Sequence, residues 1–184
     1  MKIISGYLSG RLIKSPKGTA TRPTSARAKE SLFNFLAHGL KFNFDQAQVL
    51  DLFAGSGSLG IESLSRGAKF CSFIDNDINS IITIKDNLKN LNLEKQSFVK
   101  KCDATNINFK FKNPFDLIFS DPPYKNFSKT KIAIEKINKK KLINKKGIII
   151  TELSSKDNIE MIEGFEVNKK KIIGDTQFCI YSLN

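Results

Sequence analysis

The sequence predicts an α/β fold, in which a mostly parallel, seven-stranded sheet has helices on both faces and follows a small β-hairpin and helix extension. Two observations support this. Apolar strand-like runs alternate with helical segments from Val49 onward, and the first run leads directly into a glycine-rich turn. The length of 184 residues fits one domain. We therefore expect a single domain over residues 1–184, with a basic extension (1–47) and a core (48–184).

The extension begins with two short runs that predict a hairpin. Lys2–Ser5 and Arg11–Ser15 flank two glycines, and a Pro-Lys-Gly turn follows them. The next segment predicts a helix with Thr24 or Ser25 as its N-cap. Apolar residues at helical spacing carry this helix to Gly39.

The core segment alternates apolar runs with amphipathic stretches, as repeated β–α units do. In such sheets ligands bind at the carboxyl ends of the strands, so we expect the site there. The predicted strands are 49–53, 70–74, 97–101, 116–120, 147–153, 166–173 and 177–183, the last two as an antiparallel pair. The predicted helices are 58–65, 130–137 and 79–91, the last with Ile81, Ile82, Ile84, Leu88 and Leu91 on its apolar stripe.

The composition argues against several classes of protein. No stretch approaches the roughly 20 apolar residues that a membrane-spanning helix needs. Gly6 interrupts the start before the apolar region of a signal peptide could form. We therefore expect a soluble, cytoplasmic protein without a membrane partner. The three cysteines are scattered and include no C-x-x-C pair, so the sequence predicts neither a disulfide nor a metal site.

The net charge of +12 is distributed unevenly along the chain. Residues 1–47 carry 8 basic and 2 acidic side chains, residues 48–124 carry 9 of each, and residues 125–184 carry 13 and 7. A neutral centre between two basic ends is typical of an enzyme that acts on nucleic acid. A compositional drift of the whole proteome is the alternative, because only four of the thirty basic residues are arginine.

A glycine loop follows the first core strand. Gly55, Ser56 and Gly57, together with Gly60, fit the pattern G-x-G-x-x-G, in which glycines allow a tight turn and a close approach of ligand to backbone. Asp75 comes 20 residues after Gly55, at the end of the next strand, where an acid can accept hydrogen bonds from both hydroxyl groups of a ribose. Both NAD(P) and S-adenosylmethionine carry adenosine, so these residues alone do not separate the two ligands.

Asp51 helps to separate them. It lies inside the strand, four positions before Gly55. A carboxylate is awkward beside a pyrophosphate but suits a ligand that carries an ammonium group and no phosphate. Asp51 therefore favours S-adenosylmethionine as the cofactor. It could also hold the glycine loop through backbone N–H groups, and the two roles are compatible.

The tetrapeptide Asp121-Pro122-Pro123-Tyr124 directly follows the strand at 116–120 and has no use in a dinucleotide enzyme. The exocyclic amine of a nucleobase is a poor nucleophile because its lone pair is delocalised into the ring. Acceptors on both N–H bonds, from Asp121 and the Pro122 carbonyl, would localise that lone pair. The prolines fix the backbone, and Tyr124 can stack on the base. A rigid turn without chemistry is the alternative.

Asp103 and Ala104 follow the strand at 97–101. At this place the acid can accept from the amino group of the cofactor's adenine, and the Ala104 N–H can donate to the ring. The alternative for Asp103 is an Asx-turn at a strand end.

With these motifs the chain resembles the RsmD-type bacterial rRNA guanine-N2 methyltransferases. The resemblance spans nearly the whole chain, and its opening Arg-Pro-Thr segment is absent from generic amino-methyltransferases. The matching stretches are Ile4–Gly6, Arg22–Ser25, Phe33-Asn34, Phe53–Gly60, Ser65–Ala68, Asp121–Tyr124 and Gly174–Thr176.

The resemblance implies a Rossmann-like class I methyltransferase that methylates one guanine N2 in 16S rRNA, in a small subunit already carrying some ribosomal proteins. It implies that Asp75 binds the cofactor ribose, although the family more often has Glu there. It also implies that the basic extension contacts RNA phosphates. We expect the protein to be a monomer. The residues predicted to contact RNA are Arg11, Arg22, Thr24 and Arg27.

Three other functions stay open at this point. The Asp-Pro-Pro-Tyr chemistry also serves adenine N6 and cytosine N4, in DNA or RNA, and its spacing does not distinguish these amines from guanine N2. The chain is short for an added DNA-recognition domain. A non-catalytic RNA-binding module with a decayed cofactor pocket is the second alternative, and an NAD(P) oxidoreductase is the third.

Overall fold

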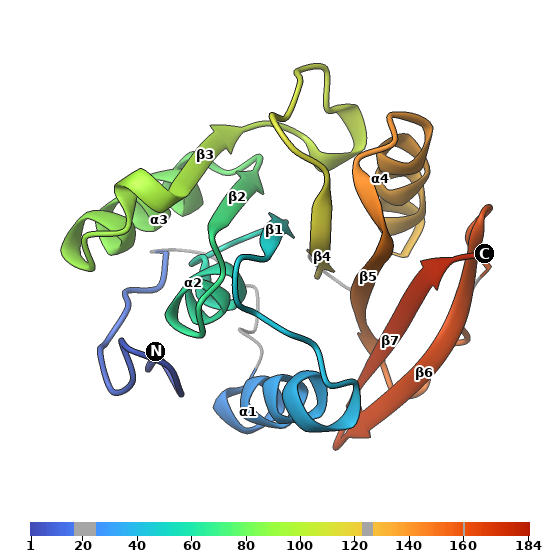
Figure 1. Ribbon diagram of the computed structural model, residues 1–184, viewed down its shortest axis with the longest axis horizontal. Coiled ribbons are helices and arrows are strands. Elements are labelled where there is room, and N and C mark those ends of the chain that lie inside the picture. The colour runs from blue at the N-terminus through green and yellow to red at the C-terminus, as the bar shows by residue number, and fades with distance from the viewer. Residues whose placement is uncertain (17–24, 123–126, 160) are drawn as a thin grey trace.

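The computed structural model describes residues 1–16, 25–122, 127–159 and 161–184. Its centre is a seven-stranded sheet of order β3-β2-β1-β4-β5-β7-β6 (Figure 1). Strands β1 to β5 pair in parallel, and β7 is antiparallel to both β5 and β6, which confirms the mostly parallel sheet with a closing antiparallel pair. The strands are β1 (Gln48–Leu52), β2 (Phe70–Asp75), β3 (Ser97–Lys101), β4 (Phe115–Ser120), β5 (Ile143–Ser154), β6 (Phe165–Ile173) and β7 (Thr176–Leu183).

Helices cover both faces of the sheet. The α-helices are α1 (Ala26–Asn34), α2 (Ser58–Ser65), α3 (Ile78–Asn90) and α4 (Phe127–Lys139), and the short turns are η1 (Phe35–Gly39), η2 (Glu94–Gln96) and η3 (Ala104–Asn106). Successive side chains of a strand point to opposite faces. In β1, Val49 packs in a cluster with α1, α2 and α3, whereas Leu50 and Leu52 pack in a second cluster with α4. The two clusters are the two halves of the core.

The N-terminal residues share the first of these clusters. Ile3, Leu8 and Ile13 are buried in it. The predicted hairpin forms in a reduced version, with a single antiparallel bridge between Lys2 and Leu12. Longer pairing is absent from the described part of this segment because the backbone N–H groups of residues 4, 5 and 7 bind α2 instead.

Helix α1 begins where the sequence places it. Ser25 is the N-cap, and its hydroxyl accepts from the Ala28 N–H at 3.1 Å. Thr24, the other candidate, lies outside the described residues. The helix ends in the π-helical turn η1, which the Leu40 N–H closes on the Phe35 carbonyl at 2.9 Å.

The stripe predicted on α3 was wrong at one position. Ile82 is 52% exposed, whereas Ile81, Ile84, Leu88 and Leu91 are buried. Ile82 follows Ile81 directly, and neighbouring residues of an α-helix lie about 100° apart around its axis, so both cannot face the sheet.

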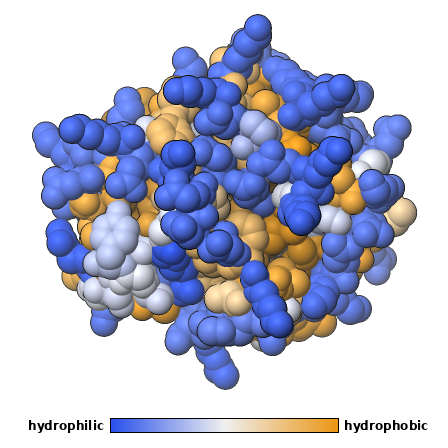
Figure 2. Space-filling model, in the orientation of Figure 1, coloured by the Kyte–Doolittle hydropathy of each residue, from blue (hydrophilic) through white to orange (hydrophobic). Residues whose placement is uncertain are grey.

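The outer surface is mostly polar, with hydrophobic residues visible between the polar side chains (Figure 2). None of the helices in the described parts of the chain has the length and apolar character needed to cross a bilayer. Cys71 and Cys179 are buried and Cys102 is half-buried, all as free thiols. Within the described ranges, no group of three or more potential ligands is placed to hold a metal ion.

Candidate active site

The carboxyl ends of the inner strands bring the predicted residues to one edge of the sheet. Leu52 at the end of β1 pairs with Ile74 on one side and with Ser120 on the other. The glycine loop, Asp75 and Asp121 therefore start from the same level of the sheet. Asp75 in turn pairs with Lys101 at the end of β3, just before Asp103.

The glycine loop uses its glycines for two different purposes. Gly55 and Gly57 have φ angles of +56° and +77°, which L side chains rarely adopt. A Cβ on Gly55 would meet nothing within 4 Å, so the loop is open at this point. A Cβ on Gly60 would lie 2.3 Å from the Phe73 ring and 2.6 Å from the Cys71 sulfur. The third glycine thus lets α2 pack directly on β2.

Asp51 replaces the missing N-cap side chain of α2. The N-cap position is Gly57, which has no side chain to bind the free N–H groups of the first turn. The Asp51 carboxylate accepts from the Gly60 N–H at 3.0 Å and is only 2% exposed. Asp51 therefore fastens the glycine loop to β1, as one of its two predicted roles requires.

Asp75 joins the end of β2 to the same loop. One carboxylate oxygen accepts from the Gly55 N–H at 2.7 Å, and the other accepts from the Asp77 N–H at 2.8 Å. Each carboxylate oxygen has two lone pairs, so the group has capacity for further donors such as hydroxyl groups. Burial raises the pKa of Asp75 from its usual value, and these backbone hydrogen bonds act against the rise.

Asn87 supports the glycine loop from α3 and was not predicted from the sequence. Its side-chain NH₂ donates to the Ser56 carbonyl and to the Lys14 carbonyl, both at 3.0 Å, and its oxygen accepts from the Lys14 N–H at 2.8 Å. The side chain is 2% exposed. Its position three residues after Ile84 on the apolar stripe was a usable signal, because a buried amide must be paired.

Asp103 is the cap of the short helix η3. One carboxylate oxygen accepts from the Thr105 hydroxyl at 2.7 Å and from the Thr105 N–H at 2.8 Å. The hydrogen bond from the Thr105 side chain is the largest cause of the lowered pKa of Asp103, and the hydrogen bond from the Thr105 N–H lowers it further. Asp103 is exposed, whereas Ala104 is buried. The geometry is that of an Asx-turn at a strand end, and contact with adenine stays a prediction.

Asp121 directly follows β4 and is half-buried, and Pro122 is buried. Burial is the main cause of the raised pKa of Asp51. The negative charges of Asp121 and Asp75 raise this pKa further. Pro123 and Tyr124 lie outside the described residues.

The electrostatics of this edge favour a cationic ligand. The carboxylates of Asp75 and Asp121 are both close enough to Asp51 to help raise its pKa, after the larger effect of burial. A ligand with a sulfonium and an ammonium group fits such an edge, whereas the negative charges of a pyrophosphate would face these acids.

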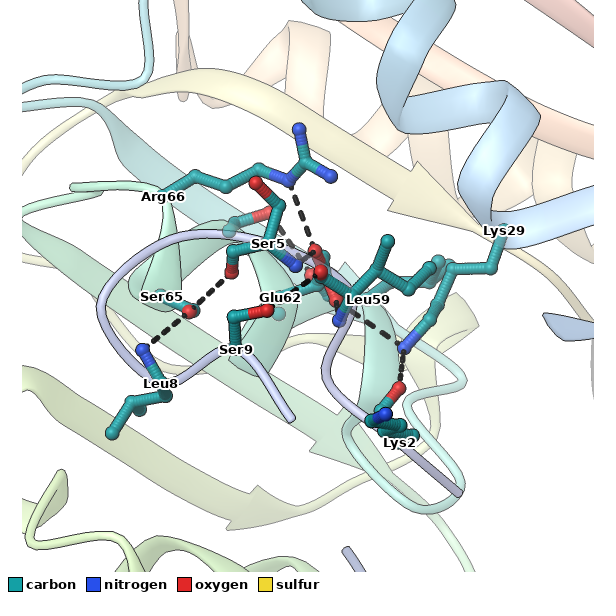
Figure 3. A network of polar contacts seen from close by, with 12 residues as sticks. Lys2, Ser5, Leu8, Ser9, Lys29, Leu59, Glu62, Ser65 and Arg66 are labelled. Carbon is teal, nitrogen blue, oxygen red and sulfur yellow. Dashed lines mark hydrogen bonds and ion pairs between the residues drawn. The ribbon is translucent and has the colours of Figure 1, made fainter. Parts of the chain in front are cut away.

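A buried ionic network fastens the N-terminal segment beside this site (Figure 3). Glu62 of α2 is fully buried and accepts from the N–H groups of Ile4 and Ser5 at 2.8 and 3.0 Å. It also contacts the Lys29 ammonium at 3.4 Å and the Arg66 guanidinium at 3.0 Å. Sequence reasoning missed this network, because its members come from three separate segments.

A close backbone approach completes this attachment. A Cβ on Gly6 would lie 1.8 Å from the Ser65 carbonyl oxygen, so this position requires glycine. The Ser65 hydroxyl donates to the Ser5 carbonyl at 2.6 Å and accepts from the Leu8 N–H at 3.1 Å. Part of the Ile-Ser-Gly motif thus serves to dock the extension on α2.

The residues predicted to contact RNA are only partly described. Arg11 is exposed, and its guanidinium donates to the Asn90 carbonyl at 3.3 Å. Arg27 is exposed on the first turn of α1. Arg22 and Thr24 lie outside the described residues. The single His38, to which no catalytic role is assigned, is exposed in η1.

Comparison with known proteins identifies the family. The model of the family described as "Conserved hypothetical protein 95" matches residues 1–182. The YlbH protein of Bacillus subtilis, provisionally named an rRNA methyltransferase, is 40% identical over 98% of both chains. The ribosomal RNA small subunit methyltransferase D of Buchnera aphidicola from Acyrthosiphon pisum is 34% identical, over 97% of this chain and 91% of its own.

The chain belongs to the RsmD family. The family resemblance that the sequence motifs indicated is therefore confirmed. A solved structure of yhhF from Escherichia coli, provisionally named a methyltransferase, has a TM-score of 0.85 and 28% identity, covering 100% of this chain and 98% of its own. A ribosomal protein L11 methylase from Lactobacillus delbrueckii, with a TM-score of 0.70 and 16% identity over 97% of this chain and 88% of its own, shares the fold. Membership of the RsmD family thus agrees with the Rossmann-like class I methyltransferase fold.

Proposed function

We propose that this protein transfers a methyl group from S-adenosylmethionine to the N2 amine of one guanine in 16S rRNA, within an assembling small ribosomal subunit. The observation that carries the proposal is the acid-lined edge of the sheet, where Asp121-Pro122 follows β4 beside the glycine loop. The names of the relatives, which are rRNA methyltransferases of the small subunit, support the choice of substrate. The proposal implies a cytoplasmic protein, and we propose that it acts as a monomer.

The cofactor-binding residues proposed here are those around the loop. Asp51 holds α2 in place and offers negative charge to the cationic end of the cofactor, and Gly55, Ser56 and Gly57 let that end approach the backbone. Asp75 accepts from the ribose hydroxyls with the lone pairs that its two backbone hydrogen bonds leave. When bound, S-adenosylmethionine supplies an electrophilic methyl group on a positively charged sulfur.

Asp103 and Ala104 are proposed for the adenine end. Asp103 is held by Thr105 through one of its two oxygens, so the second oxygen can accept from the adenine amino group. Lys129 and Lys136 help to lower the pKa of Asp103, which keeps this carboxyl ionised as an acceptor.

The residues that would act on the base follow β4. Asp121 and the Pro122 carbonyl accept from the two N–H bonds of the exocyclic amine, which localises its lone pair for attack in line with the methyl group. Pro123 stiffens this stretch and Tyr124 stacks on the base. Orientation and hydrogen-bond electrostatics would supply most of the rate. We assign no general base, because the methylated ammonium is acidic enough to lose its proton to water.

The experiment is methyl transfer from radiolabelled S-adenosylmethionine to small-subunit particles and to naked rRNA, both from a strain that lacks this protein. Nucleoside analysis should find the label in N2-methylguanosine, and the better substrate reveals the assembly stage. Label on adenine or cytosine, or on DNA alone, would contradict the guanine-N2 assignment and keep the Asp-Pro-Pro-Tyr chemistry. Label in none of these pools would favour a non-catalytic RNA-binding module.

A further inference from the structure

A cleft lies between α1–η1 and β6, on elements other than the strand ends. Its volume is about 400 Å³, and its lining includes Arg27, Asn34, Phe35, His38 and Lys171. In Figure 1, α1 lies beside β6 and β7, although these strands come much later in the sequence than α1. The cleft therefore joins the two basic ends of the sequence.

Helix α1 turns one regular row of polar side chains toward this cleft. Arg27, Ser31 and Asn34 follow one another at spacings of four and three residues, which places them on one face of α1, and His38 of η1 extends the row. At 1.5 Å per residue the row is about 16 Å long. The opposite face carries Leu32, which is fully buried in the core. The row is thus available without disturbing the packing of α1.

Two lysines of β6 face the same elements. Lys169 and Lys171 are two residues apart, so they lie on one face of the strand. The Lys171 ammonium lies 5.8 Å over the Phe35 ring, and the Lys169 ammonium lies 3.5 Å from the Gly39 carbonyl oxygen. Strand β6 is the outermost strand of the sheet. The contacts hold both cations beside the cleft.

The lining of the cleft carries more positive than negative charge, which favours an anionic partner. Arg27 and Lys171 are basic residues of the lining, and Glu30 is the one acid among the lining residues. Lys169 adds a further cation at Gly39, the residue after His38 of the lining. The charge of the cleft is opposite in sign to that at the carboxyl ends of the inner strands, where Asp51, Asp75 and Asp121 lie. Ser31 and Asn34 add neutral donors to the same lining, and such donors suit phosphate oxygens. Such a row of separated donors fits a chain of phosphates better than a single anion.

We propose that this cleft binds the phosphate backbone of the substrate RNA. The inference rests on the proposed function, which makes RNA the substrate, and adds a surface to it. Arg27, one of the residues predicted from the sequence to contact RNA, lines the cleft together with Lys171 of β6. The cleft holds the RNA in position and takes no part in the methyl transfer.

The test is the affinity of the protein for 16S rRNA and for small-subunit particles as a function of salt concentration. The double variant Arg27→Gln/Lys171→Gln should bind about tenfold or more weakly. The slope of log affinity against log salt should fall by about two, because two phosphates are then no longer neutralised. The control Lys95→Gln/Lys156→Gln removes two exposed lysines from elsewhere and should change neither quantity.

Two further variants separate binding from folding. Lys171→Arg keeps the cation over Phe35 and should keep the wild-type affinity. Asn34→Asp adds a negative charge at an exposed position, and so should weaken RNA binding while leaving thermal unfolding unchanged. Unaltered affinity and salt slope in both the double variant and Asn34→Asp would overturn the proposal.

The outcome for the cleft is distinguishable from that for the proposed function. If the wild-type protein methylates rRNA and the double variant binds it equally well, the cleft proposal fails and the function stands. If RNA affinity depends on Arg27 and Lys171 but no methyl group is transferred, the cleft stands and the proposed function fails. A wild-type protein without affinity for RNA would overturn both.

Discussion

Two buried carboxylates in neighbouring parts of this protein have opposite surroundings. Glu62 on α2 is fully buried and meets two backbone N–H groups and the cations of Lys29 and Arg66. Asp51 in β1 is 2% exposed, and its charged neighbours are the acids Asp75 and Asp121. The chain thus compensates the first carboxylate from within and surrounds the second with charges of its own sign.

We propose that this difference distinguishes an acid with a structural role from an acid that binds the ligand. A buried charge that the protein itself pairs, as at Glu62, fixes how two segments dock. Clustered acids beside an open loop cost stability in the free protein, and a bound cation would remove that cost. On this account the Glu62 network carries stability, and the acids at the ends of the strands carry cofactor binding and catalysis.

The largest change in the free energy of unfolding is expected when the Glu62 carboxylate, which pairs with Lys29 and Arg66, is removed. Glu62→Gln leaves Lys29 and Arg66 buried beside a neutral side chain, and we expect the free energy of unfolding to fall by about 3–5 kcal/mol. Urea unfolding measures this. The control Glu30→Gln, at an exposed position of α1, should stay within about 0.5 kcal/mol of the wild type. A similarly small change in Glu62→Gln would remove the basis of the comparison.

The second effect concerns turnover and not stability. Asp121→Ala removes an acceptor needed during the attack, and we expect turnover to fall by about 10²–10³-fold with cofactor affinity nearly intact. Asp45→Asn, which changes an exposed acid before the amino end of β1, is the control for single-turnover methyl transfer. Equal rates in Asp121→Ala and the control would refute the role of Asp121.

A smaller effect is expected at the ribose. Asp75→Ala removes a charged acceptor, and charged hydrogen bonds contribute about 1.5–3 kcal/mol, so cofactor affinity should fall by roughly 10- to 100-fold. Titration calorimetry measures the affinity. The matched control is Asp77→Ala, which loses the cap of α3 and therefore some stability, but should keep its affinity for the cofactor. Unaltered affinity in Asp75→Ala would show that the ribose lies elsewhere.

The smallest effect concerns the pH dependence of the free protein. Burial raises the pKa of Asp51 well above 3.8, so the folded state binds this proton more tightly than the unfolded state. The free energy of unfolding should therefore fall as the pH rises from about 4 toward the folded-state pKa. Asp51→Asn still accepts from the Gly60 N–H but cannot ionise. Its unfolding curves should match the wild type at acid pH and show less of this decline at higher pH.

Local patterns were enough to predict most of the fold and the position of the site. The strand at 97–101 and the helix at 58–65 have the predicted bounds, because apolar periodicity and the following Arg66-Gly67 are local signals. The spacing of Gly55 and Asp75 likewise predicted that both lie at one edge, and the Gly55 N–H binds Asp75.

Contacts between distant segments could not be read in this way. Glu62 binds the Ile4 N–H across 58 residues of sequence, and Asn87 binds Lys14 across 73. These contacts divert the backbone donors of the N-terminal segment, which is why the predicted hairpin keeps only one bridge. Periodicity assigns a face to each residue of an element, but it does not say which distant backbone that face will meet.

The most direct test of the central claim is calorimetric titration of the free protein with S-adenosylmethionine and, separately, with NADP⁺. Both ligands carry adenosine, but the first brings positive charge to Asp51 and Asp75 and the second brings phosphates. We predict one site per chain for S-adenosylmethionine and no measurable binding of NADP⁺ at the same concentrations. Binding of NADP⁺ without binding of S-adenosylmethionine would contradict the account.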